Sequence, residues 1–382
     1  MEPLNHTLAN FFSQSDNALA NGYYDQALQH LKEALTYTRN TNDKLGEAAV
    51  TRKLGKLYVQ KQDLNEACRY YTRTRYLLNQ IAGNEYAVAD LYSIIGDIFR
   101  KQNNLPKAES NYRDALRRFE QAGATRDKFR LERKLARVLG EQQRKEEASA
   151  YYKGVLKFFE KEEDYKKMAA LFNDLGNLYT EEEELAQAFA YYKQAYDQLE
   201  KIQDKDKDKN IEYNKIKAKT LYNMGIMYFR HQKNLAQAEN YLSRARDVYR
   251  TTRLNKAFYM QEVKTLFQLG DIGERDEDWE SAIGYYKEAW IKIKRDRSSM
   301  AEGEKQEFNG LVLLHLGRCY RKLNNISEAL PYLVEAQMIF REIGSSQYEH
   351  VEEQIGKIRH ELGSVSFASA LTLAKQEVNK RR

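Results

Sequence analysis

A small residue recurs at a nearly constant interval along most of this chain of 382 residues. Successive occurrences are separated by 40, 41, 40, 40, 49, 45 and 47 residues. The eight positions are Ser15, Gly55, Gly96, Ala136, Gly176, Gly225, Gly270 and Gly317. Self-similarity at such a period is typical of stacked supersecondary units that bury a core only against their neighbours. The chain is therefore predicted to fold as one repeat array.

Two further positions recur at a nearly constant distance from the small residue. An alanine follows it by twelve residues in seven units and by thirteen after Gly225, and a tyrosine or leucine lies four residues beyond that alanine. Glycine costs about 1 kcal/mol relative to alanine inside a helix, so its recurrence in mid-helix indicates close approach of a second helix. Stretches such as "KQNNLPKA" supply Asn caps and a proline at the start of that helix. Each unit is therefore predicted to be a pair of antiparallel helices.

This pattern resembles the tetratricopeptide repeat, whose signature has Gly and Tyr in the first helix, then Ala, an aromatic residue and a second Ala in the next. One unit carries all five positions, as Gly176, Tyr179, Ala188, Tyr192 and Ala195. The resemblance implies an all-α fold, a right-handed superhelical solenoid of antiparallel helix pairs. Some units depart from the signature, for instance at the small residue and aromatic of the first unit.

The resemblance also suggests how the chain is divided. Residues 1–345 are expected to form about eight helix-turn-helix units, and residues 346–382 to form capping helices and a basic tail. The units exceed the 34 residues usual in the family. In this they are similar to the regulator of spindle orientation, kinesin light chain and the peptide-sensing Rap proteins.

Sequence motifs for catalysis are absent. The six histidines show no HxxxH or HExxH spacing, and no GxSxG, P-loop or GxGxxG motif occurs. We therefore expect no catalytic residues, no metal ligands and no cofactor. Two cysteines cannot form a disulfide framework, the N-terminus does not resemble a secretory signal, and no apolar run approaches the roughly 20 residues of a membrane span. These features predict a cytoplasmic protein without membrane insertion.

The charge composition favours protein over nucleic acid as a partner. The chain has 62 basic and 56 acidic residues, a net charge of +6, and the acids are interspersed throughout. In tetratricopeptide arrays, the first helix of each unit lines a concave groove. The residues six and three before the small position, and one and four after it, tend to face the ligand. Applied to this chain, this rule places six basic residues in or beside the groove: Arg52, Lys56, Arg130, Arg133, Lys134 and Arg137.

Like charges stacked at helical spacing repel one another, so an acidic partner segment or neighbouring acids should offset them. A solvated helix face with basic side chains lying over apolar surface would give the same pattern. Asparagines form a second candidate group, with Asn173 and Asn177 one helical turn apart and Asn223 in the following unit. An amide offers both a donor and an acceptor and could hold an extended peptide backbone. Asparagine is also simply tolerated on a polar helix face.

These observations predict a non-catalytic adaptor or scaffold that binds an extended, acidic segment of a partner protein or peptide in a concave groove. The alternative is a Rap-type regulatory peptide receptor that acts on a signalling partner. That alternative expects a separate three-helix bundle before the repeats, whereas the repeat pattern here begins by about residue 15. The oligomeric state is left open by the sequence.

Overall fold

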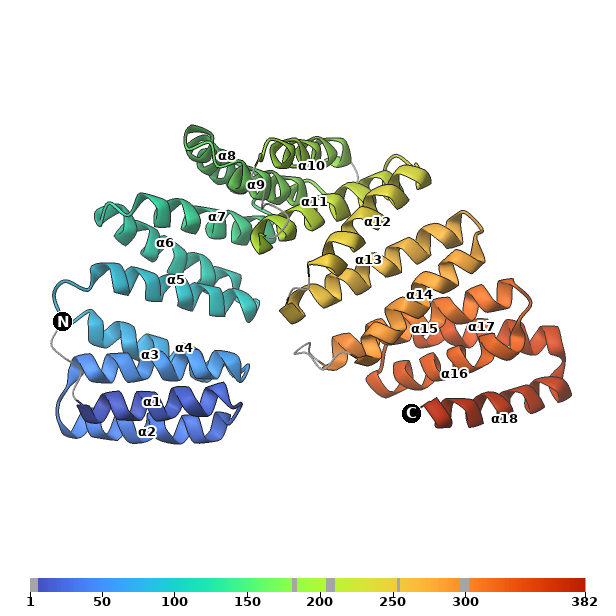
Figure 1. Ribbon diagram of the computed structural model, residues 1–382, viewed down its shortest axis with the longest axis horizontal. Helices are drawn as coiled ribbons and strands as arrows, with labels where there is room; N and C mark the ends of the chain where they lie inside the picture. The colour runs from blue at the N-terminus through green and yellow to red at the C-terminus, as the bar shows by residue number, and fades with distance from the viewer. Residues whose placement is uncertain (1–5, 181–183, 204–209, 253–254, 296–301, 382) are drawn as a thin grey trace. The chain divides into compact units, whose positions relative to one another are not determined.

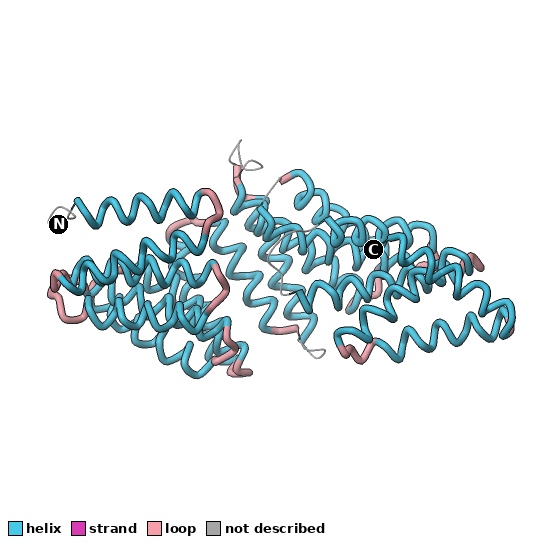
Figure 2. The backbone as a smooth tube through the Cα atoms, turned by 90° about the horizontal axis from the view of Figure 1, so that it is seen from below, coloured by secondary structure: helices cyan, strands magenta, loops and turns pink. Residues whose placement is uncertain are grey.

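The computed structural model describes residues 6–180, 184–203, 210–252, 255–295 and 302–381. Within these residues the regular structure is α-helical and no strand occurs (Figures 1 and 2), which confirms the predicted all-α fold. The helices of the described residues are α1 (His6–Ala20), α2 (Tyr24–Asn40), α3 (Lys44–Gln60), α4 (Leu64–Leu78), α5 (Glu85–Lys101), α6 (Leu105–Gln121), α7 (Thr125–Glu141), α8 (Lys145–Lys161), α9 (Tyr165–Leu178), α10 (Leu185–Glu200), α11 (Ile211–Arg230), α12 (Leu235–Thr251), α13 (Asn255–Arg275), α14 (Trp279–Arg295), α15 (Glu302–Lys322), α16 (Ile326–Ile343), α17 (Tyr348–Leu362) and α18 (Ser364–Arg381).

The first sixteen of these helices pack as eight consecutive pairs, from α1 with α2 to α15 with α16 (Figure 1). The division into about eight repeat units stays a prediction. The remaining helices, α17 and α18, both contact α16. The chain forms two compact units, residues 1–163 and 164–382, and each is described by itself. The expected boundary at residue 345 falls between α16 and α17 and stays a prediction.

The two helices of a pair cross closely at the small residue of the first helix. A Cβ atom added to Gly96 would lie 2.5 Å from the Tyr112 ring, and one added to Gly176 would lie 2.4 Å from the Tyr192 ring. These approaches are closer than carbon atoms tolerate, so the ring occupies the space that a side chain would need. The alanines of the repeat are fully buried beside these crossings: Ala27, Ala67, Ala108, Ala148, Ala188, Ala238, Ala282 and Ala329.

The turn within most pairs ends in a side chain that caps the second helix. The Asp63, Asn104 and Asn325 side chains accept hydrogen bonds from backbone N–H groups three residues later. Pro106 lies in the first turn of α6, where its missing N–H is not needed. The residue before each of these three caps has a positive φ: Gln62, Asn103 and Asn324. The Asn cap and the proline that the stretch "KQNNLPKA" predicts at a helix start are confirmed by Asn104 and Pro106.

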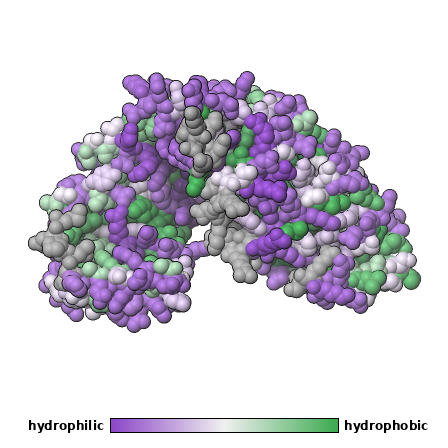
Figure 3. All heavy atoms as spheres, viewed as in Figure 1, coloured by the Kyte–Doolittle hydropathy of each residue, from purple (hydrophilic) through white to green (hydrophobic). Residues whose placement is uncertain are grey.

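The helices leave a largely polar exterior. Hydrophilic residues cover much of the face seen in Figure 3, and hydrophobic residues appear there in smaller patches. Among the described residues, no helix is both long and apolar enough to cross a membrane.

The close approach of the two helices at the glycine leads to a prediction about stability. Replacing Gly96 with alanine should destabilise the protein by about 1–3 kcal/mol, because the Tyr112 ring is fully buried and cannot retreat from the added methyl group. Gly154, in α8 of the same compact unit, is the matched control, since nothing lies within 4 Å of its added Cβ. Gly154→Ala should stabilise the helix by up to about 1 kcal/mol. Thermal and urea unfolding followed by circular dichroism would measure both, and equal effects of the two substitutions would contradict the crossing geometry.

Candidate functional site

The predicted basic residues lie on two first helices of residues 1–163, with α5 between them. Arg52 and Lys56 are exposed on α3, and the other four are on α7. Arg130 is exposed, whereas Arg133, Lys134 and Arg137 are half-buried. Hydrogen bonds connect α3 to α5 and α5 to α7. The predicted basic residues therefore lie on first helices that α5 links, and their role in binding stays a prediction.

Acids of α5 neutralise part of this surface. Arg52 Nη2 lies 2.8 Å from Asp90 Oδ2, and Lys134 Nζ lies 2.7 Å from Asp97 Oδ2. Lys134 also donates to Ser93 Oγ at 3.1 Å. All four charged side chains are at least 30% exposed, so each pair contributes roughly 0–1 kcal/mol. Neighbouring acids thus provide some of the charge compensation that the sequence required.

The α7 helix itself has a positive net charge. It contains six basic and three acidic residues, a net charge of +3. Arg130 pairs with Asp127 one turn earlier on the same helix, at 2.6 Å. Asp127 in turn accepts a hydrogen bond from Tyr86 of α5. The α3 helix, with four basic residues and one acidic residue, has the same net charge of +3.

The asparagines occupy residues 164–382 and differ from one another in exposure. Asn173 is only 1% exposed, and its amide donates to Ala169 O at 3.1 Å and to Thr220 Oγ1 at 2.6 Å. Its amide nitrogen therefore joins α9 to α11 inside the fold. This position differs from the groove-facing one that the register predicts for Asn173, because α11 packs over this part of α9.

Asn177 is the exposed member of the group, and Asn223 is half-buried. Asn177 Oδ1 accepts from Tyr192 at 2.9 Å and from Asn223 Nδ2 at 3.3 Å, while Asn223 Nδ2 also lies 3.4 Å from Asn173 Oδ1. The Asn177 Nδ2 group has no acceptor among the residues that the structure describes. The three asparagines therefore lie together, as expected, with one amide donor left at the surface.

A recurring hydrogen bond links these surfaces to the core. The buried tyrosine of a second helix donates to the residue just after the small position: Tyr112 to Asp97, Tyr192 to Asn177 and Tyr286 to Asp271. The donor and acceptor are 15 residues apart in every case. Burial raises the pKa of all three tyrosines, so their hydroxyls stay protonated. The sequence analysis missed this contact, although its constant spacing could have revealed it.

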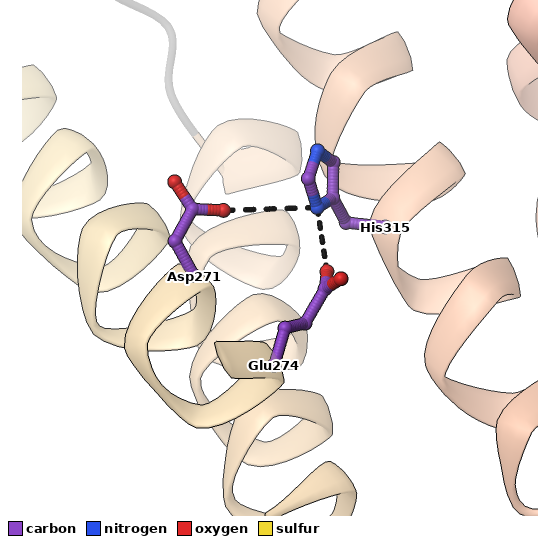
Figure 4. Close-up of side chains that lie close together, drawn as sticks. All are labelled: Asp271, Glu274 and His315. Carbon is purple, nitrogen blue, oxygen red and sulfur yellow. Dashed lines mark hydrogen bonds and ion pairs between the residues drawn. The ribbon is translucent and has the colours of Figure 1, made fainter. Parts of the chain in front are cut away.

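The third of these contacts belongs to a cluster that the sequence analysis also missed (Figure 4). His315 Nδ1 of α15 lies 2.6 Å from Glu274 Oε1 and 3.7 Å from Asp271 Oδ1, both on α13. Arg318 contacts the other Glu274 oxygen. Burial raises the pKa of Asp271; burial also acts on Glu274, but the hydrogen bond from His315 and the charge of Arg318 hold its pKa below the usual value. His315 follows Glu274 by 41 residues, about one repeat, and that separation is the signal that could have paired them.

Comparison with protein families agrees with this architecture. The model of the tetratricopeptide repeat family matches residues 46–121, 127–201 and 217–289, which together make up more than half of the chain. No curated protein sequence matches the chain. The matched segments include all of α13 and most of α11, α3 and α7, the last two of which carry the basic residues.

Several solved structures share the fold at low sequence identity. A signal transduction ATPase with numerous domains that has a tetratricopeptide repeat sensor, from Pyrococcus horikoshii, is 14% identical with a TM-score of 0.59, and the match covers 94% of this chain and 56% of that one. The apo form of the quorum sensor NprR from B. thuringiensis is 12% identical with a TM-score of 0.52, covering 87% and 97%. The apo form of RapI is 13% identical with a TM-score of 0.52, covering 76% and 99%. At these identities the likeness concerns the fold alone.

The recurring tyrosine contact can be tested by removing one hydroxyl. Tyr112→Phe should lower the free energy of unfolding by about 1 kcal/mol, because Asp97 loses a hydrogen bond of 2.7 Å. Tyr71 occupies the same repeat position beside Gly55, and its hydroxyl has no acceptor among the described residues. Tyr71→Phe should therefore change stability by less than about 0.5 kcal/mol. Urea unfolding of both variants would measure the difference, and equal losses would show that the hydroxyl contact is not stabilising.

Proposed function

Because the chain belongs to the tetratricopeptide repeat family, we propose that it is a non-catalytic scaffold that binds an extended, acidic segment of a partner protein on the first-helix faces of its repeats. The observation that carries this proposal is the basic character of α7 and α3, each of which has a net charge of +3 and carries basic residues of the predicted surface. Side chains on rigid helices bind an extended segment without having to be ordered first, which lowers the cost of association.

Charge and amide contacts would have different roles. The six basic residues would attract the acidic segment and raise its association rate, an effect that salt weakens. The exposed Asn177 amide would donate to a backbone carbonyl of a bound segment, in residues 164–382. Asn223 would orient Asn177, and Asn173 would support both from the interior. Each of the two compact units would therefore offer its own contact surface.

The partner is proposed to be a protein because acids are interleaved with the basic residues of these helices. Asp90, Asp97 and Asp127 lie on the same surface as the basic residues and would repel a continuous phosphate backbone. A Rap-type receptor is less well supported, since α1 and α2 already pack as a repeat pair where that alternative requires a separate bundle. We place the scaffold in the cytoplasm, in keeping with Cys68 and Cys319, which are both free thiols.

Charge reversal on α7 tests the attraction. A tagged wild-type protein would first identify partners by pull-down and mass spectrometry, and the affinity of the bound segment would then be measured at several salt concentrations. Arg133→Glu with Arg137→Glu should abolish capture and most of its salt dependence while leaving helicity unchanged. The matched control is Lys153→Glu with Lys157→Glu, which makes the same charge change at the same spacing on exposed positions of α8. Equal binding by both double variants would refute the basic face as the binding surface.

The amide contact requires a substitution that spares the fold. Asn177→Asp retains the acceptor for Tyr192 but removes the Nδ2 donor, and aspartate already fills this repeat position at Asp97 and Asp271. It should weaken binding by about 1–3 kcal/mol with no loss of thermal stability. Asn240→Asp, which makes the same change at an exposed position of α12, serves as the control. Unchanged affinity in Asn177→Asp would show that the amide donor does not contact the partner.

A further inference from the structure

The cluster on α13 and α15 contains the side chains of a metal site. Asp271 and Glu274 are one helical turn apart on α13 and present their carboxylates toward His315 of α15 (Figure 4). One atom from each residue lies within 4.8 Å of the other two. In the part of the chain that the structure describes, this is the only group of three or more such side chains arranged in this way. Imidazole with carboxylates is a ligand set that Zn²⁺ uses in proteins.

The size of the cluster fits a small tetrahedral ion. The Tyr286 hydroxyl of α14 lies 2.8 Å from Asp271 Oδ1, 3.0 Å from Glu274 Oε1 and 3.1 Å from His315 Nδ1. With ligand distances of 2.0–2.2 Å, the donor atoms of tetrahedral zinc stand about 3.3 Å from one another. The 2.6 Å contact between His315 and Glu274 would need to open, and the 3.7 Å contact between His315 and Asp271 to close slightly.

Neighbouring side chains hold the outer oxygen of each carboxylate. Arg318 contacts Glu274 Oε2, and Gln268 Nε2 lies 3.3 Å from Asp271 Oδ2. This leaves Asp271 Oδ1 and Glu274 Oε1 directed at His315 Nδ1. Hydrogen bonds to the outer oxygens are the support that ligating carboxylates receive in metal sites.

The charge of the cluster calls for a further cation. Two carboxylates and one guanidinium give a net charge of −1 when the imidazole is neutral. The side chains are only partly accessible, with 23% of Asp271, 17% of His315 and 7% of Glu274 exposed. Uncompensated charge is costly where water is largely excluded. A metal ion or a bound proton can supply the missing positive charge.

We propose that Asp271, Glu274 and His315 form a Zn²⁺ site, with a water molecule in the fourth position. The ion would join α13 to α15, the first helices of adjacent repeats, and so stabilise the stacking of this part of the array. The inference is independent of the proposed partner binding, which concerns other helices. The competing arrangement is a hydrogen-bonded cluster in which a proton takes the place of the metal.

Zinc binding by the full chain tests the proposal. Zn²⁺ affinity would be measured by competition with a chromophoric chelator, alongside the shift in melting temperature on adding Zn²⁺. Wild type should bind one Zn²⁺ and melt at a higher temperature with it, since a ligand that binds only the folded state stabilises that state. Excess Mg²⁺ should not compete, because it prefers six oxygen ligands. Absence of zinc binding, or binding with no thermal shift, would overturn the proposal in favour of the hydrogen-bonded cluster.

Three variants connect the binding to these residues. Asp271→Asn and His315→Gln keep polar side chains of similar size, and each should weaken zinc binding by at least about tenfold while circular dichroism remains unchanged. His360→Ala removes an exposed histidine of α17 and should bind zinc as wild type does. Co²⁺ absorption gives a second readout, because tetrahedral coordination produces visible bands that His315→Gln should lose. Equal affinity in all three variants, or a loss confined to His360→Ala, would contradict a site at His315.

Discussion

The crossing of the two helices in each unit is the contact on which the rest of the structure depends. Glycine in the first helix leaves room for a tyrosine or leucine of the second, with ring or methyl carbons where a Cβ atom would stand. Each such glycine costs about 1 kcal/mol of helix propensity. Burial of an aromatic or leucine side chain contributes about 1.5–3 kcal/mol, which more than offsets that cost. The small residue therefore stabilises the pair because it leaves room for the large buried side chain of the second helix.

The same crossing links the core to the surface. A tyrosine that fills the space beside glycine reaches across the first helix, and its hydroxyl meets the next residue on the outward face. Where that residue is Asp97, Asn177 or Asp271, it accepts the hydroxyl hydrogen bond. The crossing of Gly317 uses Leu333, which has no hydroxyl, and the next position there carries Arg318. The side chain that packs at the crossing therefore partly determines which polar residue occupies the next position on the outward face.

The sequence predicted what depends on periodicity within one unit. The register of glycine, alanine and tyrosine predicted the helix pairs, and Asn104 marks the start of a second helix in the stretch "KQNNLPKA" that the turn signals selected. Side-chain contacts between adjacent units were harder to predict, because they depend on how far one helix is displaced along the next. Asn173 illustrates this limit. Helical spacing placed it on the groove side, but Thr220, 47 residues later, covers it.

Contacts between first helices of adjacent repeats follow the length of the repeat. Arg52 and Asp90 are 38 residues apart where the repeat period is about 40, and Asn223 and Asn177 are 46 apart where it is longer. A polar residue on one first helix therefore constrains the residue about one period later. Since each repeat contacts mainly its neighbours, such a constraint extends over one or two units. Recognition residues in an array of this kind can change in adjacent pairs while the crossings that hold each unit together stay the same.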